Sequence, residues 1–313
     1  MTELEPMRRL LAIDWGSSAL RGALLDDHGR VLEERSSARG MLTVDQPGAF
    51  DGVFESTFGD WMDVPGTRCL MAGMVGSRQG WVEAAYCPAP AGLGEIVGTL
   101  TRIGPDRSAK ARDIAIVPGI SCEHDGIPDV MRGEEIKVFG ALDLLGVDDA
   151  VIVLPGTHSK WATISGGRLV GFSTVMSGEF YALLTRHSIL SRTLPAGESA
   201  LDAEAFDRGV RFAFQGHSLM QTAFSVRTLA LFDRMAPAAM PSYLSGLVIG
   251  DELRCRPLDG VGEVIVIGAP ALAERFERAL KQRGLRVRRM GEEAAWRGLS
   301  VIDRRRQRVN GEV

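Results

Sequence analysis

Two segments of the chain each place glycine and hydroxyl residues at a turn between two apolar runs. The first is LLAIDWGSSALRGALLDDHGRV, and the residues at its turn are Asp14, Gly16, Ser17 and Ser18. The second is VIVLPGTHSKWATISGGRLV, and the residues at its turn are Gly156, Thr157, His158 and Ser159. Backbone N–H groups and hydroxyls in such turns can surround phosphate oxygens, and glycine allows a close approach. The repeated pattern therefore predicts two phosphate-binding loops.

Asp14 distinguishes the first loop, because it follows the short apolar run Leu10–Ile13. A carboxylate at the end of a buried strand is costly unless it has a partner or a function. Magnesium typically takes one or two carboxylates together with substrate phosphates and waters, which suits Asp14. The alternative is that Asp14 only caps the turn. Because a second phosphate-type loop follows, we expect the role in metal binding.

A glycine-rich polar loop, GMVGSRQGW, ends the buried-looking strand at 68–74. Open α/β sheets bind ligands at the carboxyl ends of their strands. The side chains here that could bind hydroxyls and a carboxylate are Ser77, Arg78 and Gln79. A structural bend with exposed polar residues is the alternative.

The segment MRGEE contains two adjacent acids, Glu134 and Glu135, at the start of an expected helix. Acids in the first turn of a helix are common for reasons of capping and dipole alone. This turn, however, comes shortly before the second phosphate-type loop. A general base for a hydroxyl that attacks a phosphate must lie near both groups, so this turn is a candidate source of the base.

Further candidates lie in and after the second loop. Lys160 could neutralise phosphate charge or bind a substrate carboxylate, and His158 is expected to donate a hydrogen bond rather than act as a nucleophile. The apolar strand 264–267 leads into Gly268 and Ala269 at the start of a helix, where a flat base could approach the backbone. Such a turn is common in α/β proteins and has little specificity by itself.

The composition excludes several classes of function. The 313 residues are 45% hydrophobic and 24% charged, with a net charge of −4, which is ordinary for a globular protein and argues against a nucleic-acid partner. No apolar run approaches the roughly 20 residues that span a bilayer. The acidic N-terminal segment is not a secretory signal, so we expect a cytoplasmic protein without membrane contact. Four scattered cysteines without CxxC spacing predict reduced thiols and no zinc site.

The elements that must position these residues are two groups of three strands, at 9–37 and about 150–176, each followed by helices. Helices are expected at 47–62 and 93–103, after MRGEE, and over most of 178–256. The end of the chain predicts a strand at 263–267, a helix at 271–283, a strand at 285–289 and a short helix from residue 292. This order predicts a layered α/β fold in two domains, 1–148 and 149–313.

Five segments, in this order and at these spacings, resemble the 2-dehydro-3-deoxygalactonokinase (2-keto-3-deoxygalactonate kinase) family: DWGSS, MAGMVGS, MRGEE, PGTHSKW and TVMSGEF. The resemblance runs from about residue 10 to residue 302, and PGTHSKW and MRGEE are its most specific parts. It implies two ribonuclease H-like domains of the actin, Hsp70 and hexokinase fold, with ATP in the cleft between them.

The resemblance also assigns roles to residues. It makes the two turns the first and second phosphate loops, places Gly268 and Ala269 near the adenosine, and puts MAGMVGS where related sugar kinases contact the sugar. One departure concerns the base, because related carbohydrate kinases usually carry a catalytic Asp in a Gly-Asp-Gln turn. Here Gly133-Glu134-Glu135 stands in that place. Glu134 is therefore the expected base, although the longer side chain leaves Glu135 open.

The implied reaction uses ATP and Mg²⁺ to phosphorylate the 6-hydroxyl of 2-dehydro-3-deoxy-D-galactonate in galactonate catabolism. A cation must bind the carboxylate of this substrate, and the candidates are Arg78, Arg132 and Lys160. Bidentate geometry favours an arginine. Two alternatives are a kinase of the same fold for another sugar or sugar acid, and a non-catalytic nucleotide or sugar sensor. The presence of Asp14, Glu134 and both loops argues against the sensor, and the sequence leaves a homodimer open.

Overall fold

The structure, a computed structural model, describes residues 8–44, 49–108, 110–195 and 200–311. The chain divides into two compact units, of which the first comprises Met1–Asp149, Ala162–Phe172 and Glu292–Val313, and the second Ala150–Trp161 and Ser173–Gly291. The predicted boundary at 148/149 lies beside the first division point. The first unit also takes two later segments, so the predicted domain ranges stay a prediction.

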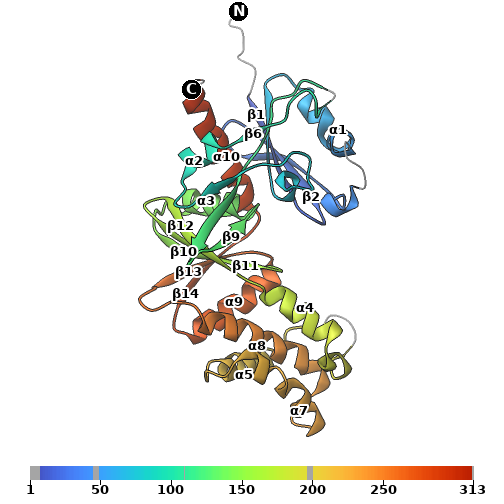
Figure 1. The fold of residues 1–313 in the computed structure, drawn as a ribbon, viewed down its shortest axis with the longest axis vertical. Helices are drawn as coiled ribbons and strands as arrows, with labels where there is room; N and C mark the ends of the chain where they lie inside the picture. The colour runs from blue at the N-terminus through green and yellow to red at the C-terminus, as the bar shows by residue number, and fades with distance from the viewer. Residues whose placement is uncertain (1–7, 45–48, 109, 196–199, 312–313) are drawn as a thin grey trace, which may run out of the picture. The chain divides into compact units, whose positions relative to one another are not determined.

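The first unit is built on a six-stranded sheet in the order β3-β2-β1-β4-β7-β6 (Figure 1). Its strands are β1 (Arg9–Trp15), β2 (Leu20–Leu25), β3 (Val31–Ser37), β4 (Thr67–Ala72), β6 (Thr101–Arg102) and β7 (Ile114–Ile116). The strands β1 to β3 form an antiparallel meander, as the sequence predicts, and β4 runs parallel to β1. The carboxyl ends of β1 and β4 therefore meet at one edge of the sheet.

Buried aromatic side chains pack against the end of β1 at this edge of the sheet. Helix α1 (Ala49–Met62) contributes Phe50 and Phe54, and Pro47 of the expected helix lies outside the described residues. The ring of Trp15 lies 5.5 Å from that of Phe50 and 6.3 Å from that of Trp81 between centroids. Because Trp15 is fully buried and follows Asp14 directly, burial of its ring fixes the backbone at the end of β1.

Helices α3 (Glu134–Leu145) and α10 (Glu293–Asn310) pack against each other within the first unit. A Cβ atom added at Gly140 would overlap the carbonyl oxygen of Ala294, and one added at Gly298 would overlap that of Ile136. The two helix backbones are therefore in direct contact. This contact holds the start of α3, where the two candidate acids lie. The sequence predicts only a short helix at the C-terminal end, and that prediction is wrong because α10 has 18 residues.

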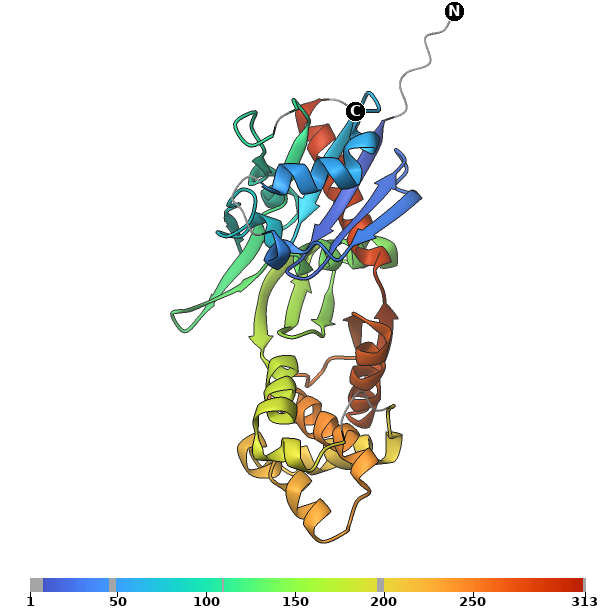
Figure 2. The ribbon, with the colours of Figure 1, turned by 90° about the vertical axis from the view of Figure 1, so that its right-hand side faces the viewer.

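A small sheet leads into α3. It has the order β5-β8-β9, with the strands β5 (Tyr86–Pro88), β8 (Gly119–His124) and β9 (Ile127–Met131). Figure 2 shows β8 and β9 as a long hairpin that stands out from the six-stranded sheet. This hairpin is not among the elements predicted from the sequence. The helix expected at 93–103 ends early, because α2 covers only Leu93–Gly98 and Thr101–Arg102 pairs with β7.

A five-stranded sheet has the order β12-β11-β10-β13-β14, and residues of β11 and β12 are divided between the two units. Its strands are β10 (Ala150–Leu154), β11 (Ser159–Ser165), β12 (Arg168–Val175), β13 (Glu263–Ile267) and β14 (Arg286–Met290). The second predicted group of three strands and the predicted strand 263–267 are confirmed. Strand β10 is parallel to β13, so their carboxyl ends also share an edge.

Between β12 and β13 the chain is mostly helical, as predicted. The helices are α4 (Ser177–His187), α5 (Ala203–Ala213), α6 (Leu219–Thr222), α7 (Ser225–Leu231) and α8 (Met240–Arg254), followed after β13 by α9 (Pro270–Gln282). Figure 1 shows α5, α7 and α8 gathered in one group. Across the part of the chain that the structure describes, no helix is long and apolar enough to cross a membrane.

Candidate active site

Three of the predicted motifs meet at the carboxyl edge of β1 and β4. Gly73 directly follows β4 with φ of 96°, and Gly133 directly precedes α3 with φ of 101°. A Cβ atom at Gly73 would lie 2.8 Å from the carbonyl oxygen of Trp15 and 3.2 Å from Oδ1 of Asp14. A Cβ atom at Gly133 would lie 3.1 Å from Cα of Gly73. Glycine at both positions therefore lets DWGSS, MAGMVGS and MRGEE approach one another.

The turn before α3 is held by its own two acids. Oε2 of Glu134 accepts a hydrogen bond from the backbone N–H of Arg132 at 3.0 Å, and Oε2 of Glu135 accepts one from Gly133 at 2.6 Å. Glu134 is half-buried, whereas Glu135 has no exposed surface. A bound substrate can thus reach Glu134 without displacing the core, but it cannot reach Glu135 in the same way.

The carboxyl group of Glu135 has an unusual proton affinity. Burial and, to a smaller extent, the neighbouring charge of Glu134 raise its pKa to about 8, against the opposing effects of backbone N–H groups and Arg132. Its Oε1 is buried without a hydrogen-bond partner. The protonated, neutral form is therefore favoured at neutral pH.

Arg132 supports this turn from the side. Its Nη2 donates to the carbonyl of Ala84 at 2.8 Å, and its Cζ lies 4.3 Å from the centre of the Tyr86 ring. Nε and Nη1 are buried and have no hydrogen-bond partner. The guanidinium is thus fixed beside the two acids by a cation–π contact and one hydrogen bond.

Asp14 lies near charged residues that are distant from it along the chain, Lys137 and Glu292, and near Arg21. Burial raises the pKa of Asp14, while the positive charges of Lys137 and Arg21 lower it and Glu292 raises it. Lys137 lies on α3, three residues after Glu134, so it shares a helix face with that acid. Sequence spacing alone could have shown that Glu134 and Lys137 share a face, but not that Lys137 lies near Asp14.

The first loop is closed on itself and on the following segment. The N–H of Gly16 donates to the carbonyl of Ala19 at 2.9 Å, and the carbonyls of Gly16 and Ser17 accept from Met41 and Leu42, each at 3.0 Å. Ser18 lies against Gly40, where an added Cβ atom would overlap its backbone. The predicted residues Gly16, Ser17 and Ser18 thus form an ordered turn directly after Asp14.

The three polar residues of the loop after β4 differ in their environments. Ser77 is buried, and its hydroxyl lies 3.3 Å from the sulfur of Met41. Arg78 and Gln79 are exposed, and the side chain of Arg78 lies 3.6 Å from Glu83. Arg78 and Arg132 are the two arginines that could bind the carboxylate of the substrate. The side chain of Arg78 is exposed to solvent, whereas that of Arg132 is packed against Ala84 and Tyr86.

The second loop is attached to the start of α4 within the second unit. The N–H of Glu179 donates to the carbonyl of Thr157 at 3.0 Å, and an added Cβ atom at Gly178 would overlap the carbonyl of Gly156. The Nε2 atom of His158 lies 2.6 Å from Oε2 of Glu179. Glu179 is 21 residues away from His158 along the chain, so local sequence does not reveal this partner.

The remaining candidates of the second unit lie around this loop. Lys160 is buried, and its Nζ donates to the hydroxyl of Thr174 at 2.7 Å. An added Cβ atom at Gly268 would lie 3.4 Å from the carbonyl of Pro155, so the turn of Gly268 and Ala269 lies beside the end of β10. The predicted second phosphate loop and adenosine turn therefore share one sheet edge.

Among the described residues, no group of three or more histidine, cysteine, aspartate or glutamate side chains could hold a metal ion. Any metal at Asp14 would need most of its ligands from phosphates and waters. This donor set suits magnesium, which usually binds through one or two carboxylates plus substrate phosphates.

Comparison with known proteins gives a consistent result. A family model described as 2-keto-3-deoxy-galactonokinase matches residues 14–302. The "Probable 2-dehydro-3-deoxygalactonokinase DgoK1" of Rhizobium meliloti (strain 1021) is 38% identical, over 94% of this chain and 96% of its own length. The 2-dehydro-3-deoxygalactonokinase of Escherichia coli (strain K12) is 33% identical, over 92% of this chain and 94% of its own.

Solved structures extend the likeness to the fold. A crystal structure from Sinorhizobium meliloti, provisionally named a 2-dehydro-3-deoxygalactonokinase, has a TM-score of 0.83 and 35% identity, over 95% of this chain and 96% of that one. The activator of 2-hydroxyisocaproyl-CoA dehydratase from Clostridium difficile, solved with bound ADPNP, has a TM-score of 0.51 at 12% identity, over 97% and 98% of the chains. The second likeness concerns the fold alone, and the predicted α/β fold of the actin-like ATPase and sugar kinase type is confirmed.

Proposed function

Because the chain belongs to the 2-keto-3-deoxy-galactonokinase family, we propose that it transfers the γ-phosphoryl group of ATP to the 6-hydroxyl of 2-dehydro-3-deoxy-D-galactonate. Phosphorylation of the keto-deoxy sugar acid by ATP is the activity of this family, and the protein is a phosphotransferase. The choice of the 6-hydroxyl and the roles of single residues belong to the proposal. Because the phosphoryl donor is ATP, we place the reaction in the cytoplasm.

The main support for the proposal is that Asp14, Gly73 and Gly133 lie close together at one edge of the six-stranded sheet. This arrangement brings the first phosphate loop, the loop after β4 and the acids at the start of α3 to one place in the first unit. Phosphoryl transfer needs a phosphate cradle, a sugar site and a base near one another. A sensor would need only the first two of these.

We assign the general base to Glu134. It is half-buried, it lies in the first turn of α3, and its Oε2 is already oriented by the N–H of Arg132. In this role its carboxylate would accept the proton of the attacking hydroxyl, or orient that hydroxyl, as phosphoryl transfer proceeds. A positioned base of this kind contributes roughly 10²–10⁴-fold to a rate.

Glu135 acts as a positioning residue in this proposal. Its side chain has no exposed surface and accepts the N–H of Gly133, so it sets the turn from which Glu134 projects. With a pKa of about 8, Glu135 is mostly neutral at pH 7. The pair therefore carries about one negative charge rather than two, which reduces the repulsion of an incoming phosphate.

Asp14 would hold Mg²⁺ together with phosphate oxygens and water, and the bound ion would neutralise charge on the phosphates. The partly buried carboxylate, whose pKa is raised by burial, gains from a nearby cation. Lys137 is a second source of positive charge beside Asp14. We propose that it binds phosphate oxygens at the first loop.

Arg78 is our choice for the carboxylate of the sugar acid. It is exposed, it lies on the loop that follows β4, and the exposed Gln79 beside it can bind hydroxyls, whereas Ser77 is buried. Arg132 is held by Ala84 and Tyr86, and Lys160 by Thr174, so both are less free to follow a substrate. An arginine also offers the bidentate geometry that a carboxylate matches.

The second unit contains further residues that we propose for nucleotide binding. Gly156, Thr157 and His158 form a loop fixed to α4, and Gly268 and Ala269 lie beside the end of β10. The Nε2 atom of His158 lies 2.6 Å from Glu179, and an imidazolium at this position would donate its Nε2–H to Glu179 and its Nδ1–H to a phosphate. We propose that this loop binds the β- and γ-phosphates and the turn at Gly268 the adenosine.

A coupled assay of ADP release tests the function. With 2-dehydro-3-deoxy-D-galactonate the protein should release one ADP for each sugar acid consumed, and phosphorus NMR should place the new ester on C6. The gluconate epimer, a neutral ketose and a reaction without sugar serve as controls. Equal turnover of the neutral ketose would replace the proposal by another sugar kinase, and nucleotide binding without any turnover would replace it by a sensor.

A further inference from the structure

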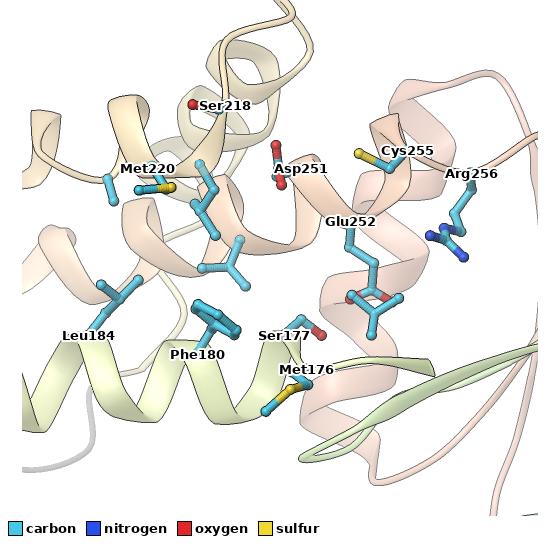
Figure 3. Close-up of a pocket in the computed structure, with 14 residues that line it drawn as sticks. Met176, Ser177, Phe180, Leu184, Ser218, Met220, Asp251, Glu252, Cys255 and Arg256 are labelled. Carbon is cyan, nitrogen blue, oxygen red and sulfur yellow. The ribbon is translucent and has the colours of Figure 1, made fainter. Parts of the chain in front are cut away.

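The second unit contains a buried acid, Glu252, that the proposed reaction does not use. It lies on α8 and is only 3% exposed. Figure 3 shows its side chain directed from α8 toward Ser177 at the start of α4, and both residues line a pocket of about 610 Å³. A buried carboxylate is costly unless hydrogen-bond donors surround it. The residues that donate to Glu252 therefore indicate what this side chain holds in place.

The donors to the carboxyl group of Glu252 come from strand β11 and helix α4. Nε1 of Trp161 donates to Oε1 at 2.7 Å. The hydroxyls of Ser177 and Ser159 form further hydrogen bonds with the carboxyl group, and their oxygens lie 3.1 Å from each other. Burial raises the pKa of Glu252, whereas these hydrogen bonds and the charge of Arg256 lower it. The carboxyl group thus connects β11 and α4 to α8.

The two hydroxyl groups belong to segments that hold the second phosphate loop. Ser159 directly follows His158 at the end of this loop. Ser177 is the first residue of α4, and a Cβ atom added at the next residue, Gly178, would overlap the carbonyl of Gly156. Glu252 is therefore bonded both to the end of the loop and to the helix start against which the loop packs.

We infer that Glu252 is a positioning residue for the second phosphate loop, and that it acts through the hydroxyls of Ser159 and Ser177. This role rests on the proposed function, in which the loop binds the β- and γ-phosphates. A binding group must be held in place by its surroundings before the ligand arrives, so loss of this support weakens the contact with phosphate. The adenosine, which we place at Gly268, should be affected much less.

Calorimetry of the full chain with ADP and with AMP tests this role, because AMP lacks the β-phosphate. Glu252→Met keeps the length of the side chain and removes both acceptor oxygens. It should weaken ADP binding about tenfold and leave AMP binding within about twofold of the wild type, because only the loop is displaced. Glu252→Gln retains one acceptor oxygen, so its ADP affinity should return to within about threefold of the wild type.

Val248→Ala is the matched control, because Val248 lies one turn earlier on the same face of α8, is as deeply buried as Glu252 and lines the same pocket. This change removes packing without removing a donor or an acceptor. The melting temperature should therefore fall, while the ratio of ADP affinity to AMP affinity stays within about twofold of the wild type.

Ser177→Ala breaks the same connection from its other end. It should also weaken ADP more than AMP, and it should add little to the effect of Glu252→Met, because the two residues act as one unit. If Glu252→Met does not fold, Ser177→Ala decides the matter, because it removes only one hydroxyl.

Three results would overturn the inference while the wild type still prefers ADP to AMP, so the proposed function would stand. The first is unchanged ADP affinity in folded Glu252→Met or, if that variant does not fold, in Ser177→Ala. The second is an equal loss of ADP and AMP affinity, which would mean that Glu252 only stabilises the second unit as a whole. The third is full additivity of Glu252→Met and Ser177→Ala. A wild-type protein that binds ADP no more tightly than AMP would instead contradict phosphate binding by the loop, and the role of Glu252 with it.

Discussion

Replacing Glu135 by Gln should change the pH dependence of stability, because the pKa of this buried carboxyl is raised from its ordinary value of 4.5 to about 8. Between these values the folded state holds a proton that the unfolded state has released. The stability of the wild type therefore falls as pH rises from about 4.5 to about 8, by ~1.4 kcal/mol for each pH unit. From pH 5.5 to 8 this group alone accounts for about 3 kcal/mol.

The glutamine variant has no proton to lose, and its amide oxygen can still accept the N–H of Gly133. Urea unfolding followed by tryptophan fluorescence at pH 5.5, 6.5, 7.5 and 8.5 measures the difference between variant and wild type. That difference should move in favour of the variant by about 3 kcal/mol across the range. The buried Trp15 and Trp81 report on the unit that contains Glu135.

Glu95→Gln is the matched control. Hydrogen bonds from Arg168 and from backbone N–H groups lower the pKa of Glu95 to about 2, so its contribution is lost only in acid, below the window of this experiment. Its effect on stability should be constant from pH 5.5 to 8.5. A Glu135→Gln difference as flat as that of the control would refute the reasoning, since it would mean that Glu135 ionises normally in the folded protein.

Three further predictions concern the two loops and the substrate. Gly178→Ala should raise KM for ATP at least tenfold, with a smaller effect on KM for the sugar acid. The reason is that the new Cβ atom would overlap the carbonyl of Gly156 and displace the loop. Equal effects on both constants would count against phosphate binding by that loop. Arg78→Gln should raise KM for the sugar acid by roughly 10–100-fold, because a charge-assisted hydrogen bond to the substrate would be lost. KM for ATP should stay within about twofold. Unchanged kinetics would exclude Arg78 as the carboxylate-binding residue. Asp14→Asn should shift the magnesium concentration for half-maximal activity upward in a titration at saturating ATP, and an unchanged midpoint would remove Asp14 from the metal site.

Much of the fold could be predicted from the sequence, because its signals are local. The apolar runs at 10–13 and 150–154, each followed by a glycine turn and two more strands, give the meanders that begin both sheets. Residues 264–267 form an uninterrupted apolar run after Glu263, and the strand appears with the predicted bounds 263–267. The turn Gly133-Glu134 and the helix after it follow from the acids and the helical apolar spacing.

The failures of prediction have physical causes. The hairpin of β8 and β9 is missed because its outer strand is mostly exposed, so apolar and polar residues do not alternate clearly along 127–131. The helix expected at 93–103 stops at Gly98, because Thr101–Arg102 finds a pairing partner in β7 that local propensity cannot reveal.

Within the candidate site, the sequence indicates which residue types are present but not their partners. Glu179 beside His158 and Lys137 beside Asp14 depend on contacts across the fold. The contrast between Glu134 and Glu135 also depends on tertiary packing, because adjacent acids in one helix turn have the same local signals. Burial alone makes one of them accessible and the other mostly neutral at pH 7.

The most direct test of the account is the turnover of Glu134→Gln with ATP and 2-dehydro-3-deoxy-D-galactonate, alongside ADP affinity by calorimetry. We predict that kcat falls by roughly 10²–10⁴-fold while ADP affinity stays within about twofold, as expected when only the base is lost. A kcat within tenfold of the wild type would contradict the account, because the group placed at the reacting hydroxyl would then be dispensable.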